Sequence, residues 1–320
     1  MTSSTLHPSS MRSLSVLPAL VCALSLPGRA QAPATAPLIL LLPSSTRAAA
    51  LGNSGVTGRD DDVVFSNPAQ LLGARTGFST TIARYGSAGT FGEMSASYAG
   101  GPLTMGWGVE YLDFSVHAGD TYPYVPAMLV SRGPVEAQGL LATVGGAYTW
   151  KGFKGGLAMK YVADRVDVAA PGAAGAEDSR HDTFLGDAGL AHNLWGGVAG
   201  LAVQNIGRGW TDGSNRIYAP FQESLGWSRG ITAGELDLGF SGEVTARRGW
   251  VSPGAGVEVG YGWIEGYSAA LRAGARRTET SGEKPVALGA TFNADRLTIE
   301  YALEFFDGGN NAHRVTLRWR

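Results

Sequence analysis

The sequence predicts an all-β protein, a 14-stranded antiparallel transmembrane β-barrel with an N-terminal plug segment. Three observations predict it: a leader of the secretory type, alternation of apolar and polar residues with period two, and connections that alternate between short and long. The alternating segments run for about nine to eleven residues, the length that a tilted membrane strand needs. Strands of soluble sandwiches average about five to six residues, so the pattern favours a membrane barrel.

The leader covers residues 1–32, with Met11 as an alternative start. One cation after Met11 is followed by an apolar run over residues 14–26 and by the A-x-A site Ala30-Gln31-Ala32. This pattern is typical of a secretory signal peptide and predicts export. The single cysteine, Cys22, lies inside the apolar run, so the mature chain is expected to have no disulfide.

Composition favours one repetitive architecture after the leader. The chain has 47 Gly, 16% charged residues and a formal net charge of −2. No later stretch approaches the ~18 apolar residues of a membrane-spanning helix. The charge gives no basic surface for nucleic acid, so we expect no nucleic-acid partner.

The alternation is clearest near the C-terminus, where Ile299 and Tyr301 alternate with Thr298 and Glu300. We assign the apolar set to the lipid-facing side and the polar set to the lumen. The same pattern predicts strands over residues 77–85, 91–99, 103–112, 139–150, 154–164, 183–192, 197–205, 220–229, 233–246, 252–262, 266–276, 285–293, 296–305 and 313–320, and hence a barrel domain over residues 77–320.

The connections predict the orientation of the barrel. Short turns are expected at residues 100–102, 151–153, 193–196, 230–232, 263–265 and 294–295, and long loops at 113–138, 165–182 and 206–219. Short turns at one end and long loops at the other indicate a Gram-negative outer membrane, with both termini periplasmic. Aromatic residues near strand ends fit girdles at the two interfaces: Trp107, Tyr111, Tyr148, Trp150, Trp227, Tyr261, Trp263 and Trp319.

The segment before the first strand, residues 33–76, does not alternate. It contains an acidic run, Asp60, Asp61 and Asp62, followed by Asn67, Pro68 and Ala69. Asn67 can cap a short helical turn with Pro68 at its first position. The acidic run is either a solvated turn or the attachment point of a plug. In the second case its partners are expected among the lumen-facing cations Arg272, Arg276, Arg314 and Arg318.

This segment also carries a resemblance to a known family. Leu42-Pro43, Arg47-Ala48, Gly52, Val56, the acidic run and Asn67-Pro68-Ala69 resemble the start of PorV/PorQ-type outer-membrane proteins, relatives of the FadL-type transporters. Residues 203–207 (VQNIG), 271–274 (LRAG) and 297–302 (LTIEYA) resemble strand segments of the same family. The resemblance implies that the N-terminal segment is a plug inside a 14-stranded barrel.

The resemblance also implies a function: a non-enzymatic barrel that assists protein secretion or surface delivery, with secretion machinery or secreted cargo as partners. The alternative is a FadL-like transporter of small hydrophobic molecules, with a hydrophobic ligand. Outer-membrane lipid is a partner in both cases. No histidine spacing suggests a metal site, no nucleophile motif suggests catalysis, and no cofactor is expected. We therefore expect no enzyme.

Overall fold

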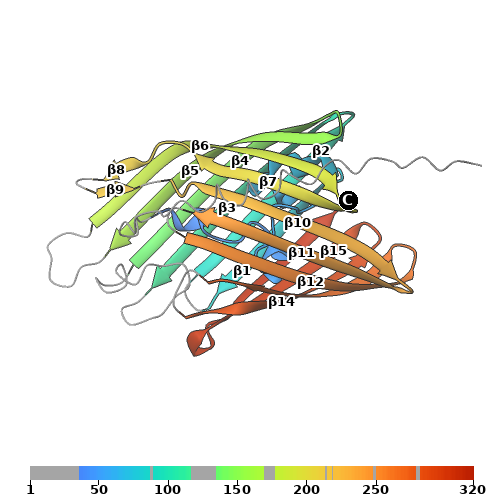
Figure 1. Ribbon diagram of the computed structural model, residues 1–320. Coiled ribbons are helices and arrows are strands. Elements are labelled where there is room, and N and C mark those ends of the chain that lie inside the picture. The colour runs from blue at the N-terminus through green and yellow to red at the C-terminus, as the bar shows by residue number, and fades with distance from the viewer. Residues whose placement is uncertain are drawn as a thin grey trace, which may run out of the picture.

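The computed structural model describes residues 36–86, 89–116, 135–168, 177–212, 215–217, 219–247, 250–278 and 282–320. Within these residues, antiparallel strands close a barrel in the order β1-β16-β15-β14-β13-β12-β11-β10-β7-β6-β5-β4-β3-β2 (Figure 1). The 14-stranded barrel predicted from the sequence is thereby confirmed. The expected signal peptide, residues 1–32, lies outside the described residues.

The barrel strands are β1 (Gly77–Tyr85), β2 (Gly89–Gly100), β3 (Leu103–Val116), β4 (Val135–Trp150), β5 (Phe153–Val168), β6 (Glu177–Leu194), β7 (Gly197–Ile206), β10 (Gln222–Ala233), β11 (Leu236–Arg247), β12 (Trp250–Ile264), β13 (Tyr267–Arg276), β14 (Glu283–Ala294), β15 (Leu297–Phe306) and β16 (Ala312–Trp319). A small hairpin, β8 (Trp210–Asp212) and β9 (Asn215–Ile217), lies in the connection between β7 and β10. We call the end of the barrel with short connections the turn side and the other end the loop side.

One predicted turn is wrong. Residues 230–232 lie inside β10, and the turn to β11 is at Gly234 and Glu235. The reason is local geometry: a two-residue hairpin turn needs a residue with positive φ, and Gly234 supplies it with φ +66°. β10 therefore runs to Ala233 instead of ending at residue 229, and β11 begins at Leu236 instead of residue 233.

The two faces of the wall differ as the alternation predicts. On β15, Thr298 and Glu300 are buried in the lumen, whereas Ile299 is exposed on the outer face. Leu271 is 70% exposed and Leu157 is 69% exposed, and they belong to the apolar outer face that transmembrane barrels present to lipid. Of the predicted girdle residues, Trp227 is half-buried and donates from Nε1 to the Leu194 carbonyl at 3.0 Å. The other girdle residues are exposed on the outer surface.

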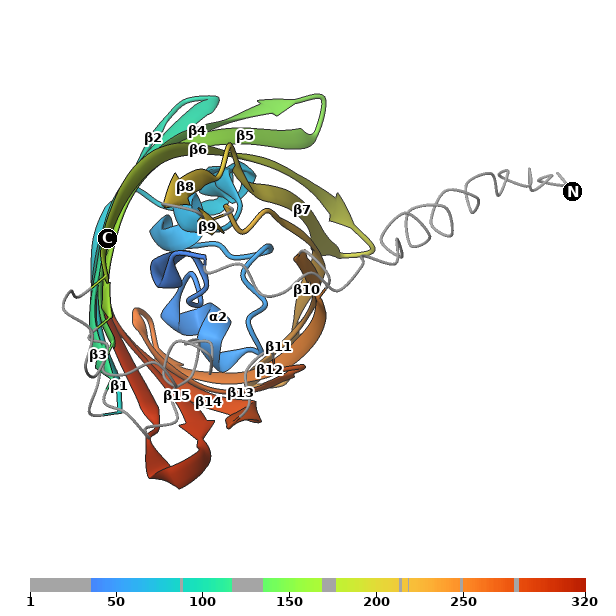
Figure 2. The same ribbon diagram turned by 90° about the vertical axis from the view of Figure 1, so that its left-hand side faces the viewer.

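The N-terminal segment fills the lumen, as the view along the barrel shows (Figure 2). It contains η1 (Leu38–Leu40), α2 (Thr46–Ala50), η2 (Asp61–Phe65) and η3 (Pro68–Gly73). Ser45 caps α2 by accepting a hydrogen bond from Ala48 N at 2.9 Å. We call residues 36–76 the plug. None of the described helices is long and apolar enough to cross a membrane.

Candidate functional site: the plug and its contacts with the wall

The acidic run of the plug contacts Arg318, a buried wall arginine on β16. Arg318 Nε donates to Asp61 Oδ1 at 2.7 Å, and Nη2 donates to Asp62 Oδ2 at 2.8 Å. Its Nη1 donates to Glu300 Oε2 of β15 at 2.7 Å and lies 3.7 Å from Asp60 Oδ2. Arg318 is only 1% exposed. One buried guanidinium therefore joins the acidic run to two neighbouring strands, and charge-assisted bonds of this kind are the strong ones.

Hydroxyl groups from neighbouring strands complete this region. Ser79 of β1 and Ser95 of β2 both donate to Asp61 Oδ2, the latter at 2.8 Å. Nearby, the Thr46 and Thr316 hydroxyls are hydrogen-bonded at 2.6 Å. We call this contact region, formed by β15, β16, β1 and β2 with the acidic run, the ionic seam.

Acid exceeds base in the ionic seam, and burial and the arginines shift the pKa values of two plug carboxyls in opposite directions. Burial raises the pKa of the Asp62 carboxyl well above its ordinary value, against the pull of Arg318. Burial acts in the same direction on Asp60. There, however, Arg318 and Arg320 together hold the pKa below its ordinary value. Arg320 forms an ion pair with Asp60 at the turn side.

The other three arginines expected to hold the acidic run contact other groups. Arg314 Nη1 donates to the carbonyl of Pro43 in the plug at 2.6 Å, so it contacts the plug outside the acidic run. Arg272 pairs with Glu258 and Glu300 of the wall. The alternation places all of these arginines in the lumen, but it does not distinguish their partners.

Arg276 also pairs with wall carboxylates, those of Glu283 and Glu304. A plug cation that the sequence analysis named only for its resemblance does reach the wall: Arg47 Nη2 lies 3.5 Å from Glu258 Oε1. Burial lowers the pKa of Arg47, although Glu258 opposes the shift.

Asn67, Pro68 and Ala69 lie on the opposite side of the plug. The Asn67 side chain accepts a hydrogen bond from Ala69 N at 3.1 Å and caps η3, with Pro68 at its first position. Asn67 Nδ2 donates to the Val56 carbonyl at 2.8 Å. Asn67 therefore ties two turns of the plug together, while its own side chain is completely buried.

The plug also touches wall positions that have no side chain. A Cβ atom built at Gly156 would lie 2.3 Å from Ala69 N, and one at Gly274 would lie 2.1 Å from Gly52 N. Such distances are too short for any side chain, so the backbone of the wall and the plug are in direct contact. We call these positions the glycine face: Gly106, Gly108, Gly139, Gly156, Gly189, Gly200, Gly226, Gly254, Gly256, Gly274 and Gly289, on β3–β7, β10 and β12–β14.

Sequence reasoning missed the polar residues at the end of β7, although residues 203–207 were noted for their resemblance. Gln204 Nε2 donates to the Phe65 carbonyl of the plug at 2.7 Å. Asn205 has φ +58°, and its backbone N donates to Asp187 Oδ1 at 2.8 Å. Lys160 pairs with Asp187 at 2.7 Å and donates to the same Phe65 carbonyl at 3.2 Å. These residues are a second polar contact between wall and plug.

The strand ladder is irregular at the same place. The β6–β7 register shifts between Gly186 and Ala188, so that Asp187 lies opposite two residues of β7. A bulge of this kind bends the strand and interrupts pairing locally.

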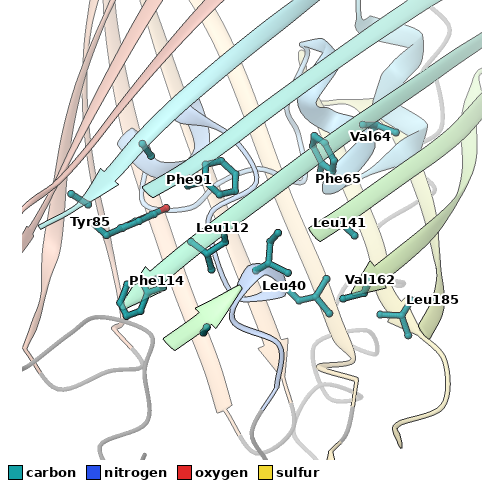
Figure 3. Packing of buried hydrophobic residues seen from close by; sticks show 14 of the residues in the cluster. Leu40, Val64, Phe65, Tyr85, Phe91, Leu112, Phe114, Leu141, Val162 and Leu185 are labelled. Carbon is teal, nitrogen blue, oxygen red and sulfur yellow. The ribbon is translucent and has the colours of Figure 1, made fainter. Parts of the chain in front are cut away.

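The lumen has an apolar space on the loop side, next to β2–β6. Buried side chains from β2 to β6 line it: Phe91, Leu112, Phe114, Leu141, Val162 and Leu185. We call this space the loop-side chamber. It is filled by the plug residues 38–42, of which Ile39 is 2% and Leu40 is 9% exposed. Figure 3 shows Leu40 between Leu112, Phe114 and Leu141.

A small cavity lies where the loop-side chamber meets the polar part of the lumen. Its volume is about 50 Å³, and it is bordered by Leu40 and Leu141 on one side and by Gln204, Glu243 and Arg247 on the other. This is room for a few water molecules, whereas an apolar cavity of about 150 Å³ is needed to take up benzene. This cavity is therefore too small for a molecule the size of benzene.

Comparison with known proteins supports the fold. No protein-family model matches this chain, and no curated protein matches its sequence. Solved structures do match. The toluene transporter TodX of Pseudomonas putida has a TM-score of 0.56 and 11% identity, covering 85% of this chain and 95% of TodX. A FadL homologue of Pseudomonas aeruginosa has a TM-score of 0.55 and 11% identity, covering 90% of this chain and 98% of its own.

At this level of identity the likeness establishes the fold and nothing beyond it. The chain has the architecture of FadL-type outer-membrane barrels. The finer resemblance to PorV/PorQ proteins stays a prediction.

Proposed function

We propose that this protein transports small hydrophobic molecules across the outer membrane. The observation that carries the proposal is the loop-side chamber, a buried apolar space inside the lumen of a plugged barrel. Such a chamber offers a hydrophobic molecule an environment that a water-filled porin lumen does not. The likeness in fold to barrels named for toluene transport and to a FadL homologue supports the same function.

Passage requires part of the plug to move, because the cavity of about 50 Å³ is too small for such a molecule. The β6–β7 bulge is one of the places in the wall where strand pairing is irregular, and we propose it as the exit. We place the short turns on the periplasmic side, so that the chamber opens toward the outside of the cell. Hydrophobic molecules would then enter from the loop side.

A role in protein secretion was the first expectation from the sequence. It depends on the PorV/PorQ resemblance alone, and no contact described above favours a cargo protein or a secretion partner. The two functions differ in a measurable way, because a secretion factor has no need to change the entry of small molecules.

The test is uptake by intact cells of a Gram-negative host that produces the protein in its outer membrane. The lipopolysaccharide leaflet slows hydrophobic molecules, so entry of radiolabelled toluene reports the added pathway. We expect faster entry of toluene than in cells without the protein, and no change for a sugar of similar size. Equal toluene entry in both cell types would contradict the proposed function.

A further inference from the structure

We propose that the outer face of the barrel binds a phosphate of lipid A, the phosphorylated glycolipid of the outer leaflet, through Arg84, His313 and Tyr301. We call these three residues the outer-face cluster. The inference goes beyond the proposed function, since the cluster lies on the lipid side of the wall and not in the lumen. It shares with that function only the placement of the loop side toward the outside of the cell.

The three side chains of the outer-face cluster lie next to one another on neighbouring strands. Arg84 of β1 and His313 of β16 are directly opposite in the strand register, and both are exposed on the outer face. On the other side of His313, Nδ1 lies 2.8 Å from the Tyr301 Oη of β15. Residues directly opposite in an antiparallel pair have Cβ atoms about 4.5–5.5 Å apart. One anion can therefore contact both Arg84 and His313.

The cluster lies at the depth of the lipid headgroups. β16 has 8 residues and β1 has 9, whereas a tilted strand needs about nine to eleven to cross a membrane. Both ends of these short strands are therefore at an interface. Arg84 is next to the last residue of β1 and His313 next to the first of β16, both on the loop side. A charge on the outer face costs far less there than at the membrane midplane.

The guanidinium of Arg84 is oriented by the backbone and not by an acid. Its Nε donates to the Gly86 carbonyl at 3.1 Å, and in the described part of the chain no carboxylate pairs with it. The carboxylate in the same row of the sheet, that of Asp113, is two strands away, which is roughly 10 Å. The charge of Arg84 is therefore available to an anion from outside the protein.

Two other cations on the loop side differ from Arg84 in this respect. Lys284 forms an ion pair with Asp307. Arg277 lies over the Trp250 ring, 4.1 Å from its centroid. Both charges thus have a partner within the chain, which makes the outer-face cluster the better candidate for binding a phosphate.

Tyr301 prepares His313 as a second donor. When the Tyr301 hydroxyl donates to Nδ1, the proton of the neutral ring is on Nε2, and a charged ring carries a proton on both nitrogens. Nε2 can therefore donate in either state. A charged His313 opposite Arg84 is a like-charge pair, which is unfavourable by itself. A phosphate between them removes this repulsion and accepts charge-assisted hydrogen bonds, which are the strong ones.

The surface beside the cluster suits the acyl chains of the same lipid. Ile82 and Val315 are directly opposite one another and are 65% and 41% exposed. They are the next outward residues from Arg84 and His313 toward the turn side. The outer face thus presents phosphate donors at the headgroup level and apolar side chains below them. This order matches a phosphorylated lipid, and the loop side selects the lipid of the outer leaflet.

The experiment measures lipid binding by native mass spectrometry of the folded protein in detergent, with bisphosphorylated lipid A as the probe. Arg84→Gln should weaken binding about tenfold, the equivalent of one charge-assisted bond. His313→Phe keeps a ring beside Tyr301 but loses both nitrogens, and should weaken binding in the same way. The matched control is Lys284→Gln, which removes the same charge from a loop-side position already paired with Asp307. It should bind as wild type does.

A conservative variant and two further lipids sharpen the result. Arg84→Lys keeps the charge and should still bind more weakly than wild type, because a lysine cannot bind two phosphate oxygens in a fork. Lipid A without phosphates should bind wild type no better than bisphosphorylated lipid A binds Arg84→Gln. Phosphatidylglycerol, an anionic phospholipid, should also bind weakly, and equally tight binding would overturn the assignment to lipid A.

The remaining outcomes decide the site itself. Wild-type binding by Arg84→Gln, shown to be folded by its heat-modifiable gel mobility, would overturn the proposal. Equal weakening by Arg84→Gln and Lys284→Gln would overturn it as well, because net charge and not the cluster would then explain the binding. The measurement does not involve toluene, so absence of toluene entry would contradict the proposed function and leave this inference intact.

Discussion

The ionic seam and the glycine face hold the same plug by opposite means. In the ionic seam, Arg318 makes specific bonds to Asp61 and Asp62 and is itself held by Glu300. On the glycine face, Gly156 and Gly274 contribute only the absence of a side chain. The seam therefore sets the register of the plug through a few directional bonds, whereas the glycine face sets its depth through shape.

This difference has an energetic consequence. Taking charges out of water costs free energy, so buried pairs contribute little net stability, but removing one partner is severe because the others stay buried and unpaired. Close packing behaves differently, because its cost is local and grows with the volume added. Loss of a single residue of the ionic seam should therefore detach the plug on that side. Substitutions on the glycine face should instead each lower stability separately.

The largest expected effect is from Arg318→Gln. It leaves Asp61, Asp62 and Glu300 without their common partner, and breaking a buried pair costs about 3–5 kcal/mol. We expect the plug to detach on this side and the barrel to conduct ions steadily in planar bilayers. The control is Arg296→Gln at an exposed turn position. A closed Arg318→Gln channel with unchanged heat resistance would show that the glycine face holds the plug alone.

The next effect compares two neighbouring glycines of β5. Gly156→Ala places a Cβ 2.3 Å from Ala69 N and should cost about 1–3 kcal/mol through overpacking. Gly155→Ala points to the other face, where the nearest atom is 3.9 Å away, and should be nearly neutral. Urea unfolding of both variants in detergent measures the difference. Equal costs would mean that strand propensity, and not contact with the plug, explains the glycine.

A smaller loss of stability is expected at a single close contact, between Gly189 and Asn67. A Cβ at Gly189 would lie 2.0 Å from Asn67 Oδ1, so Gly189→Ala should force Asn67 out of its cap. Asn67→Ala alone should cost about 0.5–2 kcal/mol. Because it removes the clashing oxygen, the double variant should lose less stability than the sum of the two single variants. Strict additivity in the double-mutant cycle would show that the two residues do not touch in solution.

The sequence was sufficient for the wall because alternation is a local signal. It placed Thr298 and Glu300 in the lumen and Ile299 outside, and the structure agrees. It failed where apolar residues face the lumen instead of the lipid. Leu112 and Phe114 share the inward face with Glu110 and line the loop-side chamber, so the apolar part of the lumen was not foreseen.

The wall residues that contact the plug could not be predicted from the sequence either, for a different reason. Four lumen arginines satisfied the same facing criterion, and only the three-dimensional register shows that Arg318 meets the acidic run, whereas Arg272 and Arg276 pair with wall carboxylates. The glycine face left a usable signal: Gly106, Gly108 and Gly156 stood at inward positions of alternating strands. Small residues facing a lumen indicate that something packs closely against them.

The smallest expected effect is that of salt on the ionic seam. Raising the ionic strength from 0.1 to 1 M shortens the Debye length from about 10 Å to about 3 Å, which weakens exposed pairs far more than buried ones. Arg318 is 1% exposed, whereas Lys284 and Asp307 form a pair with 53% and 56% exposed side chains. We therefore expect plug opening in wild type to change by less than ~1 kcal/mol across this range. The part that does respond should come from Arg320, whose side chain is 30% exposed beside Asp60. Arg320→Gln should accordingly remove most of the residual salt dependence of the conductance without opening the channel. If 1 M salt instead opens the wild type as fully as Arg318→Gln does, then water reaches the seam, and the plug is held by solvent-exposed charges rather than by a buried guanidinium.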